Sequence, residues 1–278
     1  PLFGEPTEYG ILTIISTLAW GLGYFGMPQV LVRFLGIRSA EEVRQSRIIA
    51  VVWVVISMVC ALCIGFIGRA MLPTYFGTNA AAENIFIVIA QMILPAFMCG
   101  VVVSGILAAS MSSASSYLLI TGSSVAENIF RGIIKRDATD RQVMIVSRIT
   151  LAVVMIIGIV IALDENSVIF RVVSYAWAGL GASFGPIVLC SLYWRRTNLP
   201  GALAGMLGGA ITVVVWHNLI KPLGGVFGIY ELLPAFIISL VCIFVVSKLT
   251  AEPSQEIYDE FDHYTEARMD EDVNPTAA

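Results

Sequence analysis

The 278-residue sequence predicts an all-α membrane protein with seven transmembrane helices. The first indication is composition: 58% of the residues are apolar and 13% are charged, whereas soluble domains have about 45–50% and about 25%. The second is that the apolar residues lie in long segments, and a helix needs about 20 apolar residues to cross the hydrocarbon core. The composition therefore argues against a soluble globule, a disordered chain and a nucleic-acid-binding protein.

Seven apolar segments are long enough to cross a bilayer. In order along the chain they are residues 11–35, 48–72, 95–121, 144–163, 168–194, 201–219 and 230–249. A further apolar segment, residues 80–93, has only 14 residues. That length is typical of an interfacial or re-entrant helix rather than of a span.

The positive charges alternate between the loops and thereby predict the orientation of the spans. Thirteen Lys and Arg residues lie in or beside the loops after spans one, three and five and after span seven, and only Arg69, Arg171 and Lys221 lie on the other side. Because Lys and Arg concentrate in cytoplasmic loops, the first span is expected to start outside the cell (inner or plasma) membrane. The C-terminal tail is then cytoplasmic.

The tail, residues 251–278, carries nine acidic side chains and one basic side chain, a net charge of −8. The rest of the chain has a net charge of +4. This pattern predicts a solvated cytoplasmic segment after a basic membrane-embedded body. Regulation by the tail is the alternative interpretation.

Two spans contain glycine- and proline-rich stretches at membrane depth, residues 20–28 and 179–186. A broken helix in lipid requires protein or a wet cavity to receive the freed backbone groups, and such breaks point to the binding site of a transporter. Close packing of helices through small residues is the alternative. For residues 179–186 both interpretations stay open. Aromatic residues interleaved with the glycines favour a site at 20–28.

The depth of Trp20 supports the same interpretation. Trp20 lies about ten residues, or about 15 Å, into the first span. That places it near the bilayer midplane rather than in the interfacial aromatic belt. On an intact α-helix Tyr24 would share the face of Trp20, one turn further on.

Ionisable side chains are almost absent from the interiors of the spans. Glu127 and Glu231 lie at span ends, and His217 lies near the end of the sixth span. The segment therefore has no carboxylate or histidine relay of the kind that proton-driven carriers use. The sequence also contains no nucleophile–base pair, phosphate-binding loop or constellation of metal ligands, which argues against an enzyme.

A run of small hydroxyl residues occupies the third span. At the helical repeat, Ala109, Ser112, Ser113 and Ser116 share one face. Hydroxyl and carbonyl oxygens can bind a hard monovalent cation such as sodium without a carboxylate. Alternatively, the small residues let helices approach, and the hydroxyls donate to carbonyls one turn earlier.

With these stretches the chain resembles the sodium:solute symporter family, and within it the bacterial sodium/proline symporters. The likeness covers essentially the whole chain. It is carried by residues 19–26 with Pro28 and 33–34, by 106–109 with 111–112, and by 174–179, 184–186 and 201–206.

The resemblance implies a fold and a division of the chain. Residues 1–194 would form the second five-helix inverted repeat of the amino-acid-transporter fold, with a short interfacial helix at about 80–93. Residues 195–250 would form two peripheral transmembrane helices, followed by the acidic tail 251–278. The resemblance also implies a partner that is missing here, an N-terminal transmembrane repeat of the same protein that precedes Pro1.

The resemblance further implies sodium-coupled symport of L-proline into the cell by alternating access, with Na⁺ as the coupling ion. The family's proline-binding Trp, Tyr and Pro match Trp20, Tyr24 and Pro28. Its sodium ligands, an alanine carbonyl and two adjacent hydroxyls, match the following three residues: Ala109, Ser112 and Ser113.

The sequence departs from the family's proline carriers just past Gly26. Met27 and Gln29 stand where those carriers usually have Gln and His. Two alternative functions therefore remain. One is transport of another small solute, an amino acid or a carboxylate, on the same fold. The other is a membrane domain that senses sodium or solute and signals through partners.

Overall fold

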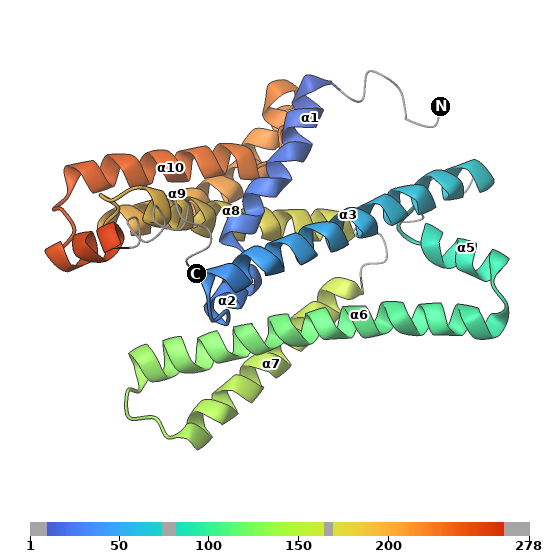
Figure 1. Ribbon diagram of the computed structural model, residues 1–278, viewed down its shortest axis with the longest axis horizontal. Coiled ribbons are helices and arrows are strands. Elements are labelled where there is room, and N and C mark those ends of the chain that lie inside the picture. Colours follow the sequence, from blue (N-terminus) through green and yellow to red (C-terminus); the bar gives the residue numbers. More distant parts are fainter. Residues whose placement is uncertain (1–9, 74–81, 164–168, 264–278) are drawn as a thin grey trace. The chain divides into compact units, whose positions relative to one another are not determined.

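The computed structural model describes residues 10–73, 82–163 and 169–263, and within these ranges it contains helices and turns but no strand (Figure 1). This confirms the all-α prediction. The elements are α1 (Ile11–Leu18), η2 (Ala19–Gly26), α2 (Pro28–Leu35), α3 (Ala40–Met71), α5 (Ile85–Ile93), α6 (Ala96–Ser123), η3 (Ser124–Ile134), α7 (Asp140–Ala162), α8 (Ile169–Tyr193), α9 (Leu199–Val215), η4 (Trp216–Ile220), η5 (Lys221–Leu223), η6 (Gly225–Gly228) and α10 (Leu232–Leu249).

The spans agree with the predicted segments in number and order. Among the described residues, six helices are long and apolar enough to cross a membrane, and a bent pair, 11–26 with 28–34, makes a seventh if it is counted as one span. The largest difference in length is in the third span, where α6 continues without interruption into the π-helix η3 and ends at Ile134. The chain is therefore a multi-pass membrane protein.

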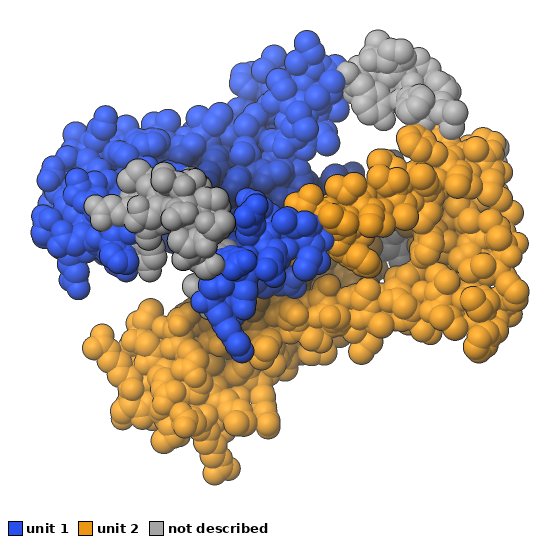
Figure 2. All heavy atoms as spheres, in the orientation of Figure 1, with its two compact units in different colours: residues 1, 3–50, 170–278 blue, residues 2, 51–169 orange. Residues whose placement is uncertain are grey.

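The described residues divide into two compact units, which Figure 2 colours separately. Unit 1 comprises residues 3–50 and 170–278, of which 10–50 and 170–263 are described. Unit 2 comprises residues 51–169. Unit 1 contains the broken first helix together with α8, α9 and α10, and unit 2 contains most of α3 together with α5, α6 and α7.

In unit 1 the helices α9 and α10 form a tightly packed hairpin. Small residues on α9 let α10 approach: a Cβ added at Gly205 would lie 2.3 Å from Ile243 Cγ1. The hydroxyl of Ser239, which is fully buried, donates to the Gly205 carbonyl oxygen at 2.8 Å. Small residues and interhelical hydrogen bonds are what holds helices together in lipid, where burial of apolar side chains gives no driving force.

Helix α8 is continuous from Ile169 to Tyr193, with Pro186 inside it. Of the two interpretations of residues 179–186, the structure therefore supports close packing and not a break. The buried glycines Gly181 and Gly185 form the surface on which η2 lies: a Cβ at Gly181 would lie 2.7 Å from the Gly23 Cα, and one at Gly185 would lie 3.5 Å from the Leu22 carbonyl oxygen.

Unit 2 has few buried residues along its spans. The apolar windows of α3, α6–η3 and α7 are unburied within the described chain. Contacts are made at glycines, such as Gly68 of α3, where a Cβ would lie 2.5 Å from Ile85 of α5, and Gly122 of α6, where it would lie 2.9 Å from Ser147 of α7. The predicted short helix at about 80–93 corresponds to α5, and residues 80–81 lie outside the described chain.

The start of the acidic tail is attached to the turn between α8 and α9. Arg195 pairs with Asp262 at 2.5 Å and Arg196 with Glu252 at 2.6 Å. Asn198 caps α9 and also donates to the carbonyl oxygen of Ala251 at 2.7 Å. Residues 251–263 make these specific contacts while none of them is buried, and the ion pairs are half exposed. Residues 264–278 lie outside the described chain.

The contact between η2 and α8 should respond sharply to side-chain size. Gly181→Ala places a methyl group 2.7 Å from the Gly23 Cα, a backbone atom that cannot rotate away. We expect a loss of about 1–3 kcal/mol of stability, the usual cost of overpacking. Thermal unfolding of the purified protein in detergent measures it.

Gly179→Ala is the matched control, because a Cβ there meets nothing within 4 Å. That variant should be neutral or gain up to about 1 kcal/mol from helix propensity. Equal melting temperatures for the two variants would contradict this account of the packing.

Candidate functional site

The site is built on a helix that changes type at membrane depth. The α-helical bonds of α1 end at Leu18, and the next eight residues, Ala19–Gly26, form the 3₁₀-helix η2. Such runs are uncommon beyond three or four residues because their hydrogen bonds are poorly aligned. The glycines at 21, 23 and 26 lower the α-helical propensity of this stretch. The predicted break at residues 20–28 is therefore present.

The bend follows at Met27 and Pro28. Proline disfavours the α conformation in the residue before it, and Met27 is extended, with φ −83° and ψ 116°. Pro28 then starts α2, where its missing N–H leaves no internal hydrogen bond unmade. The axes of the two segments differ by 49°. The sequence Gly-Met-Pro thus determines both the end of one helix and the start of the next.

A side chain from α8 pairs with the loosened backbone. The indole N–H of Trp177 donates to the Trp20 carbonyl oxygen at 3.1 Å. Gly23 makes room for it, because a Cβ at that position would lie 2.0 Å from the Trp177 Nε1. This hydrogen bond joins residues 157 apart in the sequence and gives the Trp20 carbonyl oxygen a partner from another helix.

Trp20 lies in an aromatic cluster. Its ring is stacked, with interplanar angles of 13–15°, on the rings of three residues: Phe170 at 5.2 Å, Trp177 at 5.4 Å and Tyr230 at 5.9 Å between centroids. Trp20 is half-buried, and its indole N–H has no hydrogen-bond partner among the described residues. A donor on a half-open aromatic face can bind a polar group of a small ligand.

The structure brings Trp20 and Tyr24 together through Trp177 rather than by stacking one above the other. A 3₁₀-helix has three residues per turn, so residues four apart do not lie on one face. The alignment of Trp20 and Tyr24 on one face, expected for an intact α-helix, is therefore absent. Tyr24 instead meets the edge of the Trp177 ring, 4.8 Å between centroids and 80° between planes, and its side chain is half exposed. Pro28 follows at the first turn of α2.

The predicted sodium ligands Ala109, Ser112 and Ser113 lie on α6, in unit 2, and all three are exposed. Some serines of the run bond to their own helix, as the packing interpretation predicts, and others keep a free hydroxyl, as an ion site requires. Hydroxyls of three neighbours donate to carbonyl oxygens one turn earlier: Ser110 to Ile106 at 2.9 Å, Ser115 to Met111 at 2.7 Å and Ser116 to Ser112 at 3.1 Å. Within the described ranges, the hydroxyls of Ser112 and Ser113 make no such bond. These two oxygens are free to act as ligands.

Sequence reasoning missed three members of the aromatic cluster. Trp177 was within a stretch that carries the family resemblance, but no role was assigned to it. Phe170 and Tyr230 are far from Trp20 in the sequence, and no spacing rule connects them. The available signal was that apolar spans with glycine-rich stretches at matching depth are able to pack closely.

Comparison with known proteins decides the family. The sequence pattern of the sodium:solute symporter family matches residues 7–209. The chain belongs to the sodium:solute symporter family. The expectation that it is not an enzyme agrees with this membership, since the family consists of symporters.

Three bacterial relatives illustrate the similarity. The chain is 42% identical to the high-affinity proline transporter PutP of Bacillus subtilis, over 91% of this chain and 53% of the relative. It is 39% identical to the osmoregulated proline transporter OpuE of the same organism, over 90% and 51%. It is 38% identical to a sodium/proline symporter of Haemophilus influenzae, over 94% and 52%. The chain thus spans about half the length of these relatives. No solved structure matches it.

The hydrogen bond from Trp177 to Trp20 gives a test of the site's geometry. Trp177→Phe keeps an aromatic ring against Trp20 but removes the N–H that pairs with the carbonyl. We expect a loss of about 0.5–1.5 kcal/mol in stability, the net contribution of one such bond. It is measured by thermal unfolding in detergent.

Trp194→Phe is the control for that substitution. Trp194 follows α8 and packs on Phe244 at 4.4 Å, and its N–H has no partner among the described residues. Trp194→Phe should lower the stability less than Trp177→Phe does. A larger loss at Trp194 than at Trp177 would contradict the proposed pairing.

Proposed function

We propose that this chain is part of a secondary active transporter that couples inward movement of sodium to uptake of L-proline by alternating access. The observation that carries the proposal is the break in the first helix, where half-open aromatic rings and loosened backbone meet at Trp20. Relatives named as proline transporters at about 40% identity support the choice of solute.

The chemistry of the aromatic cluster suits proline. The pyrrolidine ring is small and apolar, and it packs well on the flat faces of Trp20 and Tyr24. The free indole N–H of Trp20 is a donor for the carboxylate of the solute. Pro28, at the start of α2, completes the proposed substrate site. Met27, one of the two departures from the family pattern, is 2% exposed, so that change lies in the packing and not at the solute.

The chemistry of the serine pair suits sodium. A hard monovalent cation binds oxygen ligands, and Ser112 and Ser113 each offer a hydroxyl that no neighbouring carbonyl occupies. In the proposed site the Ala109 carbonyl oxygen is a third ligand. Sodium binding would stabilise one conformation of the transporter and thereby raise the affinity for the solute, a coupling that depends on differential affinity between two states.

We further propose an arrangement for the whole protein. Residues 1–194 act as the second five-helix inverted repeat, 195–250 as two peripheral helices and 251–278 as a cytoplasmic tail, with the first span starting outside. The unburied faces of α3, α6 and α7 fit this arrangement, because they leave room for lipid and for an N-terminal repeat of the same protein. That repeat would supply the remaining ligands of both sites.

The substrate site is tested by Trp20→Ala in the full-length protein. We expect the proline concentration for half-maximal uptake to rise about tenfold or more, because an aromatic side chain at the centre of a site carries much of the binding energy. Tyr24→Phe should act in the same direction but less, by the one hydrogen bond of about 1 kcal/mol that its hydroxyl can give. Uptake of radiolabelled proline into vesicles measures both.

Trp53→Ala is the control. Trp53 lies on α3 with 70% of its surface exposed, in unit 2. If its removal impairs proline recognition as much as removal of Trp20, the substrate site is misplaced. Competition by other amino acids and small carboxylates in the same assay identifies a different solute.

The sodium site is tested by Ser112→Ala and Ser113→Ala in the same vesicles. Loss of one neutral ligand to a cation should cost about 1.5–3 kcal/mol, a roughly ten- to hundredfold rise in the sodium concentration needed for half-maximal uptake. Ser115→Ala should change little, because the Ser115 hydroxyl is already bonded to the Met111 carbonyl oxygen.

Sodium dependence itself is tested by replacing sodium with choline. Uptake should then be lost. Equal uptake in choline, driven by a pH gradient alone, refutes sodium coupling. Equal sodium dependence of all three serine variants would reduce the serine run to a packing feature.

A further inference from the structure

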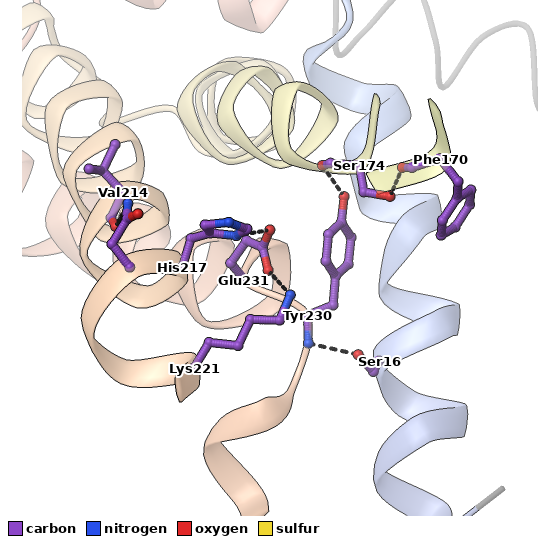
Figure 3. Close-up of polar contacts among 9 residues, drawn as sticks. Ser16, Phe170, Ser174, Val214, His217, Lys221, Tyr230 and Glu231 are labelled. Atoms are coloured by element: carbon purple, nitrogen blue, oxygen red, sulfur yellow. Dashed lines mark hydrogen bonds and ion pairs between the residues drawn. The ribbon is translucent and has the colours of Figure 1, made fainter. Parts of the chain in front are cut away.

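A carboxylate is buried at the start of α10, where the sequence suggested only a span end. Glu231 is 1% exposed. Its Oε2 accepts a hydrogen bond from the Lys221 ammonium at 2.7 Å, and its Oε1 lies 3.0 Å from the His217 Nδ1 (Figure 3). The Lys221 ammonium forms an ion pair with the Glu231 carboxylate. An ionised carboxylate only accepts hydrogen bonds, so it pairs with the His217 tautomer that has its proton on Nδ1.

The local chain path explains why these three side chains meet. After α9 the backbone widens into the π-turn η4, which holds His217, and then tightens into η5, which starts at Lys221. Gly224 and Gly225, with φ of 73° and 60°, reverse the chain, and Glu231 returns beside His217 and Lys221. We call His217, Lys221 and Glu231 the outer ion cluster. Single π-turns within helices often mark functional positions.

The residue next to the outer ion cluster connects it to the proposed substrate site. The Tyr230 hydroxyl donates to the Ser174 carbonyl oxygen on α8, and its backbone N–H donates to the Ser16 hydroxyl on α1, each at 2.7 Å (Figure 3). The ring of Tyr230 is stacked on Trp20. One residue of the peripheral hairpin thus contacts both helices that carry the aromatic cluster.

The two hydrogen bonds lie one turn from the pair of tryptophans. Ser16 precedes Trp20 by four residues on α1–η2, and Ser174 precedes Trp177 by three on α8. The Trp177–Trp20 bond forms the other connection between these helices. Two connections therefore set the distance between α1 and α8 at the site. One is Tyr230, which bonds to Ser16 and Ser174, and the other is the Trp177–Trp20 hydrogen bond.

We propose that Tyr230 is a positioning residue for Trp20, and that the outer ion cluster fixes Tyr230 in the place from which it acts. This inference rests on the proposed function, in which Trp20 binds the solute. The peripheral hairpin α9–α10 then sets solute affinity without touching the solute. The ion pair holds Glu231, and with it the neighbouring Tyr230, in place, because Glu231 cannot shift without leaving the Lys221 charge unpaired.

The test uses the full-length protein labelled with 5-fluorotryptophan, in lipid nanodiscs. The chain has five tryptophans, and the fluorine resonance of Trp20 is assigned by its loss in Trp20→Phe. Tyr230→Phe keeps the stacked ring and loses the bond to Ser174. Glu231→Gln keeps the shape and loses the charge. Both should move the Trp20 resonance, because its shift depends on the three rings stacked around it.

The same variants are compared in proline uptake driven by a sodium gradient. We expect the half-saturating proline concentration to rise about three- to tenfold, the effect of losing one hydrogen bond. The maximal rate should change less. Glu231→Gln combined with Lys221→Met removes both charges of the ion pair, and it should restore affinity and resonance part of the way. This double variant also keeps the test valid if a single variant does not fold.

Matched controls come from the cytoplasmic end of unit 1. Tyr258→Phe removes a hydroxyl from the ring beside Arg195, and Glu252→Gln removes one partner of Arg196, which is an exposed ion pair. Neither should move the Trp20 resonance or the affinity. The inference is overturned if Tyr230→Phe and Glu231→Gln leave the Trp20 resonance in place, or if they move it while proline affinity stays as in the parent protein.

The two proposals can fail separately. If the parent protein takes up no proline, the proposed function is refuted, and the resonance alone decides whether Tyr230 positions Trp20. If proline uptake is robust and Trp20→Ala weakens it, while the Tyr230 and Glu231 variants behave like the controls, the proposed function stands and the positioning role is refuted.

Discussion

A peptide group in hydrocarbon must have a hydrogen-bond partner, and the rest of unit 1 depends on how this constraint is met at Trp20. Glycine and proline weaken the helix there, and lipid offers no hydrogen-bond partner. The indole N–H of Trp177 donates to the Trp20 carbonyl oxygen and so adds a partner from another helix. That bond requires α8 to lie directly against the break, which in turn requires glycines on both surfaces. Local weakness in one helix is thus compensated by close packing with another.

The same contact explains the composition of the neighbouring helices. Backbone lies on backbone where Gly26 meets Gly185 and Leu180, with a hypothetical Cβ only 2.7 Å from their atoms. Large aromatic rings then fill the space beside the glycines, as Trp177 does at Gly23. Small and very large side chains alternate because the first allow the approach and the second fill what remains. The aromatic cluster is therefore part of the packing as well as the proposed binding surface.

The sequence was sufficient to predict the features that depend on neighbouring residues. Span number, the break before Pro28 and the short helix α5 follow from apolar length and from the local effects of glycine and proline. The role of Trp177 could not be predicted from the sequence, because its partner Trp20 is 157 residues away and no periodicity encodes that contact. The meaning of residues 179–186 was open for the same reason: a glycine-rich stretch is compatible with both a break and a packing surface until the opposing helix is known. The free hydroxyls of Ser112 and Ser113 also required coordinates, since every serine in a helix can donate to the preceding turn.

The outer ion cluster has a consequence for the order in which the chain assembles. His217 and Glu231 are 14 residues apart, so their contact closes a short loop and needs no other helix. A carboxylate enters a low-dielectric environment at little cost only when its counter-charge is already beside it. The bonds of Tyr230 to Ser174 and Ser16 span 56 and 214 residues, so each closes a much longer loop. Locality thus favours formation of the α9–α10 turn before Tyr230 joins α1 and α8.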